Sequence, residues 1–219
     1  MQRFAHQNLR TPGPTPIPDD IIEAMTNPMI NHRGPQYKEM LFRITDRLKQ
    51  VYETRGDVWI LTSSGTGAME AAIVNTLSPG DKVINATVGV FGNRFGEIAE
   101  VYGAEVVTLG FPFGEAIDVD RLRGALRDNP DAKAVLVTHS ETSTGVANDL
   151  EAVAAVVRGE SDALLLVDGI SSVASLPVST DRWGCDVVAS ASQKGWMLPP
   201  GLAFISFSQQ AWKAHATAR

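Results

Sequence analysis

The sequence predicts an α/β fold of three layers, in which helices cover both faces of a mostly parallel seven-stranded sheet that contains one antiparallel strand. Three observations lead to this fold class. Short apolar runs rich in Val, Ile and Leu alternate with segments of helical periodicity. The last run follows a Pro-Pro-Gly turn that is too short for a helical crossover. The chain has 219 residues, 44% of them hydrophobic, which is enough for one sizeable core.

The apolar runs give the predicted strands and the periodic segments give the predicted helices. The strands cover residues 58–62, 82–85, 105–109, 134–138, 163–167, 187–189 and 202–207. The helices lie near residues 67–77, 93–102, 119–128 and 149–158, and residues 208–219 resemble the opening of one more. Because the run 202–207 follows the tight turn Pro199-Pro200-Gly201, we expect it to pair antiparallel with a neighbour.

The chain divides into an arm and one large domain. Residues 1–18 are predicted as an extended N-terminal arm, because Thr11-Pro12-Gly13-Pro14-Thr15-Pro16 is rich in proline. Such an arm needs a surface to lie against. Residues 19–219 form the large domain. Nothing after Arg219 could build a further domain, so we expect a truncated chain.

Composition argues against several classes of function. The formal net charge is −6 and no Lys/Arg cluster occurs, which disfavours nucleic acid or an anionic membrane as partner. The single cysteine, Cys185, excludes an internal disulfide and a cysteine-rich metal site, and it fits a reducing compartment. Residues 1–10 contain charges without an apolar core, so they are no secretory signal, and no apolar run approaches a membrane span. We therefore expect a cytoplasmic protein.

Lys194 and Asp168 are the two residues whose chemistry best fits one common ligand. Lys194 follows the predicted strand 187–189, and Asp168 ends the apolar run 163–167. Loops at the carboxyl ends of strands are where open α/β sheets bind ligands. A lysine amine forms a Schiff base with a carbonyl cofactor, and a carboxylate at the end of a buried strand keeps a pyridine nitrogen protonated. The pair therefore indicates pyridoxal phosphate.

Each of these two residues has an alternative interpretation. A lysine followed by glycine is most often a solvated loop residue. An unpaired carboxylate at a buried strand end is costly, so Asp168 needs a cationic partner, which a pyridinium N–H would provide. A metal ion is the rival partner. However, no set of His, Asp and Glu at ligand spacing accompanies Asp168, so no metal site is predicted.

Two glycine-containing helix starts could bind an anion. Residues 62–67, with the sequence Thr-Ser-Ser-Gly-Thr-Gly, place backbone N–H groups and a helix dipole where a phosphate would be favoured, although an ordinary Ser/Thr cap is the alternative. They are not a P-loop, because no Gly-Lys-Ser/Thr follows. Residues 88–96 have the wrong glycine spacing for a dinucleotide site and no correctly placed acidic partner for a ribose, so we reject a nicotinamide site.

Three further features admit both a functional and a structural interpretation. Phe91 either lays its ring on a flat aromatic cofactor or simply packs. The polar cluster at residues 138–146 offers hydroxyls for a cofactor's ring oxygen, or it forms a solvated turn closed by Gly145. His139, a lone histidine beside a strand, is interpreted as structural rather than as a catalytic base.

Taken together, five segments resemble the class V aminotransferases, which are fold type I pyridoxal-phosphate enzymes, and in particular their alanine/serine–glyoxylate branch. The resemblance spans nearly the whole chain, and the combination is more specific than any single motif. It implies the large domain of that fold, and it implies a homodimer. The segments are Thr11–Pro14, Ser64–Glu70, Glu141–Val146, Asp168–Ser172 and Ser192–Gly195.

The resemblance also implies a reaction and roles for individual residues. An amino acid such as serine or alanine would donate its amine, and a 2-oxo acid such as glyoxylate or pyruvate would accept it. Lys194 would form the internal aldimine and move a proton between the substrate α-carbon and the cofactor, and Asp168 would hold the pyridine nitrogen. Seven further residues would contact the cofactor. Its phosphate would be held by Ser64, Gly65, Thr66 and Gln193. Its two ring faces would be contacted by Phe91 and Ile170, and Thr142 would bind near its phenolic oxygen.

The chain departs from the family pattern in three places. Related enzymes often have histidine where Thr66 stands and tryptophan where Phe91 stands. They also continue into a small C-terminal domain that supplies the arginine for the substrate carboxylate, and phosphate contacts from the partner subunit come from beyond the position of Arg219. Neither has a counterpart before Arg219.

Two other functions stay open beside transamination. A class V lyase such as a cysteine desulfurase needs a cysteine nucleophile on a mobile loop, whereas Cys185 lies just before the strand that leads to Lys194. The other is a fragment of the large domain that binds cofactor, or merely dimerises, without catalysis.

Overall fold

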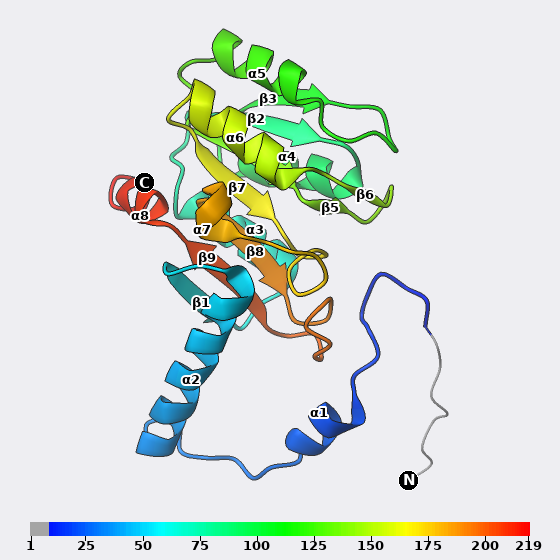
Figure 1. Ribbon diagram of the computed structural model, residues 1–219. Helices are drawn as coiled ribbons and strands as arrows, with labels where there is room; N and C mark the ends of the chain where they lie inside the picture. Colours follow the sequence, from blue (N-terminus) through cyan, green and yellow to red (C-terminus); the bar gives the residue numbers. More distant parts are fainter. Residues whose placement is uncertain (1–8) are drawn as a thin grey trace.

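The computed structural model describes residues 9–219 and shows a seven-stranded sheet with helices on both faces (Figure 1). Strand β9 runs antiparallel to both of its neighbours, β1 and β8, and every other pairing in this sheet is parallel. The predicted fold class, with one antiparallel strand among seven, is confirmed. In spatial order the strands are β1 (Asp57–Leu61), β9 (Ala203–Phe207), β8 (Val187–Ala191), β7 (Leu164–Asp168), β4 (Ala134–Thr138), β2 (Lys82–Thr87) and β3 (Glu105–Gly110).

The central strands are buried along their whole length because both of their faces are covered. Every residue of β4, β7, β8 and β9 is buried. This is the pattern expected of a sheet enclosed between two helix layers. The register pairs Thr138 at the end of β4 with Asp168 at the end of β7, and Asp168 with Ala189 on β8. Polar groups at the strand ends are thereby brought to one edge of the sheet.

The two faces of the sheet carry separate apolar cores. One face packs against α5 (Val119–Asp128), α6 (Leu150–Glu160) and the last turns of α2 (Pro35–Tyr52). The other packs against α3 (Gly65–Val74), α4 (Val90–Val101) and α8 (Gln209–His215). The connections from β2 and β4, which are neighbours in the sheet, therefore lead to opposite faces. Such a switch point opens a crevice beyond the carboxyl ends of the two strands.

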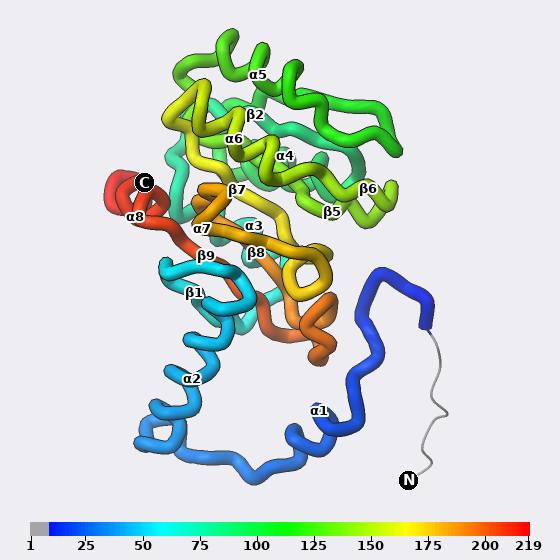
Figure 2. Tube along the Cα trace, in the orientation of Figure 1, coloured from blue at the N-terminus to red at the C-terminus, as the bar shows by residue number. Residues whose placement is uncertain are grey.

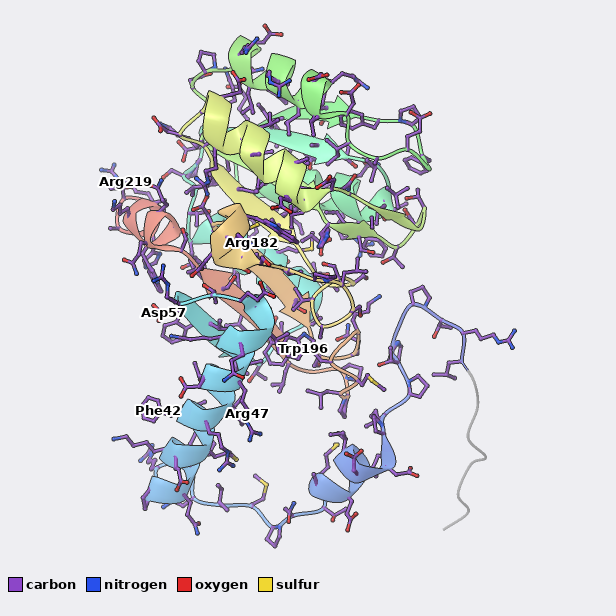
Figure 3. All side chains as sticks on the ribbon, in the orientation of Figure 1. Phe42, Arg47, Asp57, Arg182, Trp196 and Arg219 are labelled. Carbon is purple, nitrogen blue, oxygen red and sulfur yellow. The ribbon has the colours of Figure 1, made fainter. Side chains whose placement is uncertain are left out.

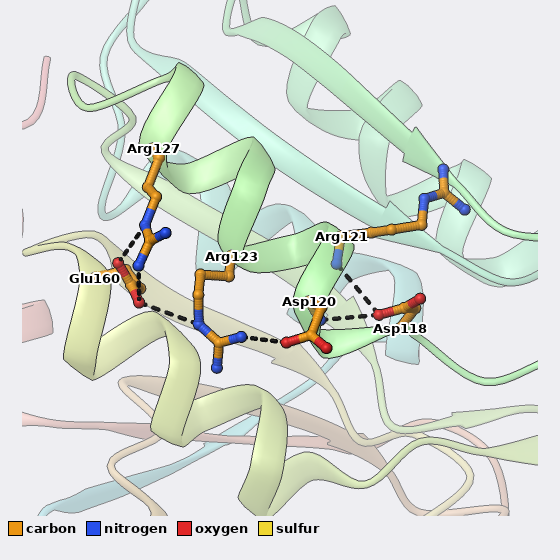
Figure 4. Close-up of polar contacts among 6 residues, drawn as sticks. All are labelled: Asp118, Asp120, Arg121, Arg123, Arg127 and Glu160. Atoms are coloured by element: carbon orange, nitrogen blue, oxygen red, sulfur yellow. Dashed lines mark hydrogen bonds and ion pairs between the residues drawn. The ribbon is translucent and has the colours of Figure 1, made fainter.

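An arginine network joins the outer surfaces of α5 and α6 (Figure 4). Arg127 Nε lies 3.0 Å from Glu160 Oε2, and Arg123 Nε lies 3.1 Å from Glu160 Oε1. Asp118 caps α5 by accepting hydrogen bonds from the backbone N–H groups of Asp120 and Arg121. Because exposed ion pairs contribute little, we attribute the packing of these helices mainly to buried leucines and valines such as Leu122 and Val153.

Within the described residues, three helices and one hairpin were not predicted. The long helix α2 projects from the sheet and α1 (Asp19–Ala24) lies beyond it, as Figure 2 shows. Only Leu48 and Tyr52 of α2 are buried, while Phe42 points away from the core with 60% of its surface exposed (Figure 3). The other two are a hairpin of β5 (Ser140–Glu141) with β6 (Val146–Ala147) and the single turn α7 (Thr180–Trp183).

The described part of the N-terminal segment lies against the loop that contains Lys194. Residues 9–18 form no helix or strand, and residues 1–8, which complete the predicted arm, lie outside the described part. Thr15 donates its N–H to Gln193 O at 3.0 Å and its hydroxyl to Lys194 O at 3.1 Å. This is the surface that the proline-rich segment needs. Within residues 9–219, no helix combines the length and apolar character that crossing a membrane requires.

Candidate active site

A pocket of about 330 Å³ opens at the carboxyl edge of the sheet. Its volume lies within the range of small-molecule sites. The structure brings all nine predicted site residues into its lining, although they come from five separate loops and helix starts. These residues are Ser64, Gly65, Thr66, Phe91, Thr142, Asp168, Ile170, Gln193 and Lys194.

Asp168 is a buried carboxylate at the end of β7, with 3% of its surface exposed. Its Oδ1 accepts the N–H of Ile170 at 3.0 Å, and its Oδ2 accepts the hydroxyl of Thr138 at 3.3 Å. Burial raises the pKa of Asp168 to about 6, and the two hydrogen bonds and the nearby Lys194 offset that rise in part. A cationic ligand N–H would relieve this cost, so the carboxylate is suited to hold one.

Lys194 faces the same pocket from the loop after β8. Its pKa is lowered, mainly by partial burial, while the nearby Asp168 opposes that change. A lysine with a lowered pKa is more often neutral, and a neutral amine is the nucleophile that Schiff-base chemistry needs. The backbone that carries Lys194 is held on one side by Thr15, and Gly195 packs closely against Val173 and Ser175 on the other.

The start of α3 offers unpaired backbone donors to the pocket. Ser64 is the N-cap residue, and its hydroxyl accepts the N–H of Gly67 at 3.3 Å. Within residues 9–219, no protein acceptor binds the N–H of Gly65 or of Thr66. An N-terminal helix turn with free N–H groups is a natural anion site. The cap and the phosphate interpretations of this segment are therefore compatible.

Apolar side chains line other parts of the pocket. Phe91, in the first turn of α4, is half-buried, and the guanidinium of Arg94 lies 5.2 Å from its ring centroid. Ile170 follows Asp168 and packs closely on Gly65: a Cβ at position 65 would lie 2.7 Å from Ile170 Cδ1. Gly65 thus leaves room for the close approach of Ile170, in the loop after β7, to the start of α3.

The hydroxyl of Thr142 lies 2.7 Å from that of Ser171, so these two loops are linked at the pocket. We did not predict Ser171, Arg94 and Glu141 as residues of the site region. Nor did we predict Gly13 and Pro14, which line the pocket from the arm. A signal for the arm existed, because its proline-rich segment belongs to the family resemblance and needs a surface to lie against.

His139 and Cys185 lie outside this pocket. His139 meets Trp183 edge-on, with 6.3 Å between ring centroids, and burial lowers its pKa to about 4. Cys185 is buried beside Asp186, which lies at the opposite end of the sheet just before β8. Burial raises the pKa of the Cys185 thiol to about 12. Neither residue is placed to react with a ligand next to Lys194.

Comparison with known proteins gives consistent family matches. The sequence matches the family described as Aminotransferase class-V over residues 8–217. It is 42% identical over 212 residues to L-aspartate–glyoxylate aminotransferase of Paracoccus denitrificans, covering 95% of this chain and 54% of that protein. A relative from a Synechococcus strain is named soluble hydrogenase, small subunit, and is 45% identical over 213 residues, covering 96% of this chain and 55% of that protein. The chain thus spans about half the length of these relatives.

A solved structure agrees with the sequence matches. The crystal structure of an alanine–glyoxylate aminotransferase from Nostoc sp. superposes with a TM-score of 0.91 at 32% identity, covering all of this chain and 59% of that one. Cysteine desulfurases also superpose, but at 18% identity they share the fold alone. With the family match spanning almost the whole sequence, the chain belongs to the class V aminotransferase family.

Proposed function

We propose that this chain forms the cofactor-binding part of a pyridoxal-phosphate-dependent aminotransferase. The observation that carries the proposal is the pairing, in one pocket, of a buried carboxylate with a raised pKa and a lysine with a lowered pKa. Asp168 needs a cationic N–H partner, and Lys194 is tuned as an amine nucleophile. A pyridine nitrogen and an aldehyde on one small molecule satisfy both requirements.

The other groups in the pocket also fit pyridoxal phosphate. The free N–H groups of Gly65 and Thr66, at the N-terminus of α3, are suited to its phosphate, with Ser64 and Gln193 beside them. Phe91 and Ile170 offer apolar surfaces for the two faces of its ring. Thr142, whose hydroxyl is linked to that of Ser171, would offer an oxygen to the ring oxygen of the cofactor. The residues present therefore fit the group.

The chemistry divides between the cofactor and the chain. When bound, the cofactor supplies an electron sink for a carbanion at the substrate α-carbon. Lys194 would hold the cofactor through its amine and would carry the proton that leaves the substrate α-carbon. Asp168 would keep the pyridine nitrogen protonated, which would make the sink effective.

We propose glyoxylate as amino acceptor and a small amino acid as donor. The names of three relatives or neighbours support the acceptor, because aspartate–glyoxylate, serine–glyoxylate and alanine–glyoxylate aminotransferases all include glyoxylate. The donors in these names differ. Serine and alanine are the donors that we infer from the sequence resemblance, with pyruvate as a second possible acceptor.

A homodimer in the cytoplasm completes the proposal. Exposed apolar side chains cluster in the N-terminal helices, including Ile22 and Met25 of the α1 region and Leu41 and Phe42 of α2. A second subunit would cover such a surface. The measurement is the molar mass of the purified chain in solution by light scattering, and a monomer at micromolar concentration would contradict this part.

The test of the main proposal is the visible absorbance of the purified chain with added pyridoxal phosphate, measured beside Lys194→Ala. We expect a band that depends on Lys194 and that decreases when serine or alanine is added. A Lys194-dependent band that no amino acid changes would favour the alternative, a fragment that binds cofactor without catalysis. A chain that gives no Lys194-dependent band would refute the cofactor assignment.

A lyase of the cysteine desulfurase type is disfavoured by the position of Cys185. Its thiol is buried, its pKa is raised to about 12, and it lies at the far end of the sheet from Lys194. A thiol that acts as a nucleophile needs a lowered pKa and access to the substrate.

A further inference from the structure

Glu141 is a buried carboxylate at the switch point of the sheet. It lies in β5, directly after β4, and has none of its surface exposed. Within residues 9–219, no Lys, Arg or His pairs with it. A buried charge without a counter-ion must be stabilised by hydrogen bonds or by a dipole. The groups that donate hydrogen bonds to Glu141 therefore indicate the role of this residue.

The carboxylate of Glu141 accepts four hydrogen bonds, two on each oxygen. Its Oε2 accepts the backbone N–H groups of Phe91 and Gly92, both at 3.0 Å. Its Oε1 accepts the N–H of Ser143 at 3.0 Å and the hydroxyl of Ser143 at 2.7 Å. The same hydroxyl accepts the N–H of Val90 at 3.0 Å. Three N–H groups at the start of α4 are therefore capped by residues about 50 positions further along the chain.

Helix α4 cannot provide this cap itself. Its N-cap residue is Gly89, which has no side chain and makes no side-chain cap hydrogen bond. A Cβ at Gly89 would lie 2.5 Å from Glu141 Cγ, so the glycine leaves the room that Glu141 occupies. The positive end of the helix dipole adds to the stabilisation of the carboxylate. Glu141 and the α4 terminus thus fit each other in shape and in charge.

Glu141 connects two walls of the pocket. Phe91, whose N–H it binds, lines the pocket from α4, and the adjacent residue Thr142 lines it from the hairpin and is linked to Ser171. We propose that Glu141 is a positioning residue that fixes Phe91 against the face of the cofactor ring, an inference that rests on the proposed function. It makes no hydrogen bond to Asp168 or Lys194, although its charge contributes to the raised pKa of Asp168, and it acts through Phe91.

The substitution Glu141→Gln removes this function with little change in shape. Each oxygen of the carboxylate accepts two donors, whereas an amide has one oxygen and one NH₂ group. An NH₂ group at the position of Oε2 would face the N–H groups of Phe91 and Gly92, and one at the position of Oε1 would face the N–H of Ser143, so at least one backbone donor lacks an acceptor in either orientation. The remaining hydrogen bonds also lose the charge of the carboxylate, so the start of α4 is held less firmly. We expect Glu141→Gln to weaken the binding of pyridoxal phosphate about 10-fold, because Phe91 is then no longer fixed in place. Glu151→Gln on the exposed surface of α6 is the matched control and should leave binding unchanged.

A double-mutant cycle on the dissociation constant of pyridoxal phosphate tests whether Glu141 acts through Phe91. The four proteins are the wild-type chain, Glu141→Gln, Phe91→Ala and the double variant. We expect the double variant to bind no more weakly than Phe91→Ala alone, since without the ring there is nothing to position. A 10-fold effect of Glu141→Gln that persists in the Phe91→Ala background would overturn the proposal.

Hydrogen exchange of backbone amides without cofactor provides an independent readout. We expect Glu141→Gln to accelerate exchange at Phe91 and Gly92 while the amides of β4 keep their protection. Ser143→Ala, a milder change, should accelerate exchange at Val90. Unchanged exchange in both variants would overturn the proposal. A wild-type chain that binds no cofactor would instead refute the proposed function, so the two failures are distinguishable.

Discussion

Replacing Asp168 by asparagine should stabilise the cofactor-free protein while damaging the site. The carboxylate is buried, and within the described chain its hydrogen-bond donors are the N–H of Ile170 and the hydroxyl of Thr138. Asparagine has nearly the same shape and carries no charge. Its oxygen can still accept the N–H of Ile170, and its NH₂ group can donate to the Thr138 hydroxyl. The variant therefore removes the charge and keeps the local hydrogen bonds.

The magnitude follows from the pKa of Asp168, which burial raises from 3.8 to about 6. The folded protein therefore holds a proton that the unfolded chain releases between about pH 4 and pH 6. The free energy of unfolding must fall as the pH rises through this window, because the folded state binds more protons. A pKa change of one corresponds to about 1.4 kcal/mol, so the full loss above pH 6 is about 3 kcal/mol.

The assay is urea unfolding of the cofactor-free wild-type and Asp168→Asn chains between pH 4 and pH 8. We expect similar free energies of unfolding at pH 4 and a variant that is more stable by about 3 kcal/mol at pH 8. His139 also titrates in this range, but it contributes equally to both chains and cancels in the difference. A difference that does not change with pH, or a variant less stable at pH 8, would refute the reasoning.

The same substitution should weaken function if the chain binds pyridoxal phosphate as proposed. A neutral amide cannot keep the pyridine nitrogen protonated, and a hydrogen bond to a charged group is worth about 1.5–3 kcal/mol. The corresponding loss is about 10- to 100-fold in the rate at which an amino acid bleaches the cofactor band. Asp168 would then be an example of a binding residue that lowers the stability of the empty protein.

Three further predictions concern the arm, the buried histidine and the cysteine. Thr15→Val removes the hydroxyl that donates to Lys194 O, so it should lower the free energy of unfolding by about 1 kcal/mol and weaken cofactor binding. Thr45→Val, on the exposed helix α2, is the control and should not affect binding. The wild-type chain should lose about 2 kcal/mol of its free energy of unfolding between pH 8 and pH 5, because the pKa of His139 is about 4 in the folded protein and 6.5 in the unfolded chain. His139→Leu should abolish this loss. Urea unfolding at the two pH values checks this, and an unchanged loss would contradict it. Cys185 should react slowly with a thiol reagent at pH 8 until the protein unfolds, because its pKa is raised to about 12; rapid reaction of the folded chain would show the burial to be wrong.

The sheet could be predicted because its strands are buried on both faces. The seven apolar runs each correspond to a strand of the sheet, within two residues at every end. The antiparallel direction of β9 followed from the short turn at residues 199–201. Helix boundaries were harder: α4 begins at Val90 rather than near 93, because its first turn is capped by Glu141 and Ser143. A cap supplied from 50 positions away leaves no local pattern.

Helices α1 and α2 were missed for the opposite reason. In α2, which has 18 residues, only Leu48 and Tyr52 are buried, and α1 has no buried residue. Apolar periodicity arises from packing against a core, and these helices pack little against the described chain. The hairpin β5–β6 has only two residues per strand, which is shorter than any alternation that could be recognised.

The residues of the pocket could be found from chemistry, whereas their supports could not. Lys194 and Asp168 stand out because an amine and a buried carboxylate at strand ends suggest one ligand. The contact of Thr15 with Lys194 joins residues 179 positions apart, and that of Glu141 with Phe91 joins residues 50 positions apart. Such pairs depend on topology, which brings the loops to one edge of the sheet.

The hydrogen bonds that hold these pocket residues in place all form without a ligand. The Asp168 carboxylate is oriented by Ile170 and Thr138, and the Phe91 backbone is held by Glu141. A pocket whose walls are fixed in advance loses little conformational entropy when it binds, so more of the contact energy is available for affinity. The cost is the ionisation of the buried Asp168 in the cofactor-free protein, because its carboxylate forms no ion pair within residues 9–219. The fixed carboxylate of Asp168 therefore both prepares the pocket for a ligand and lowers the stability of the cofactor-free protein.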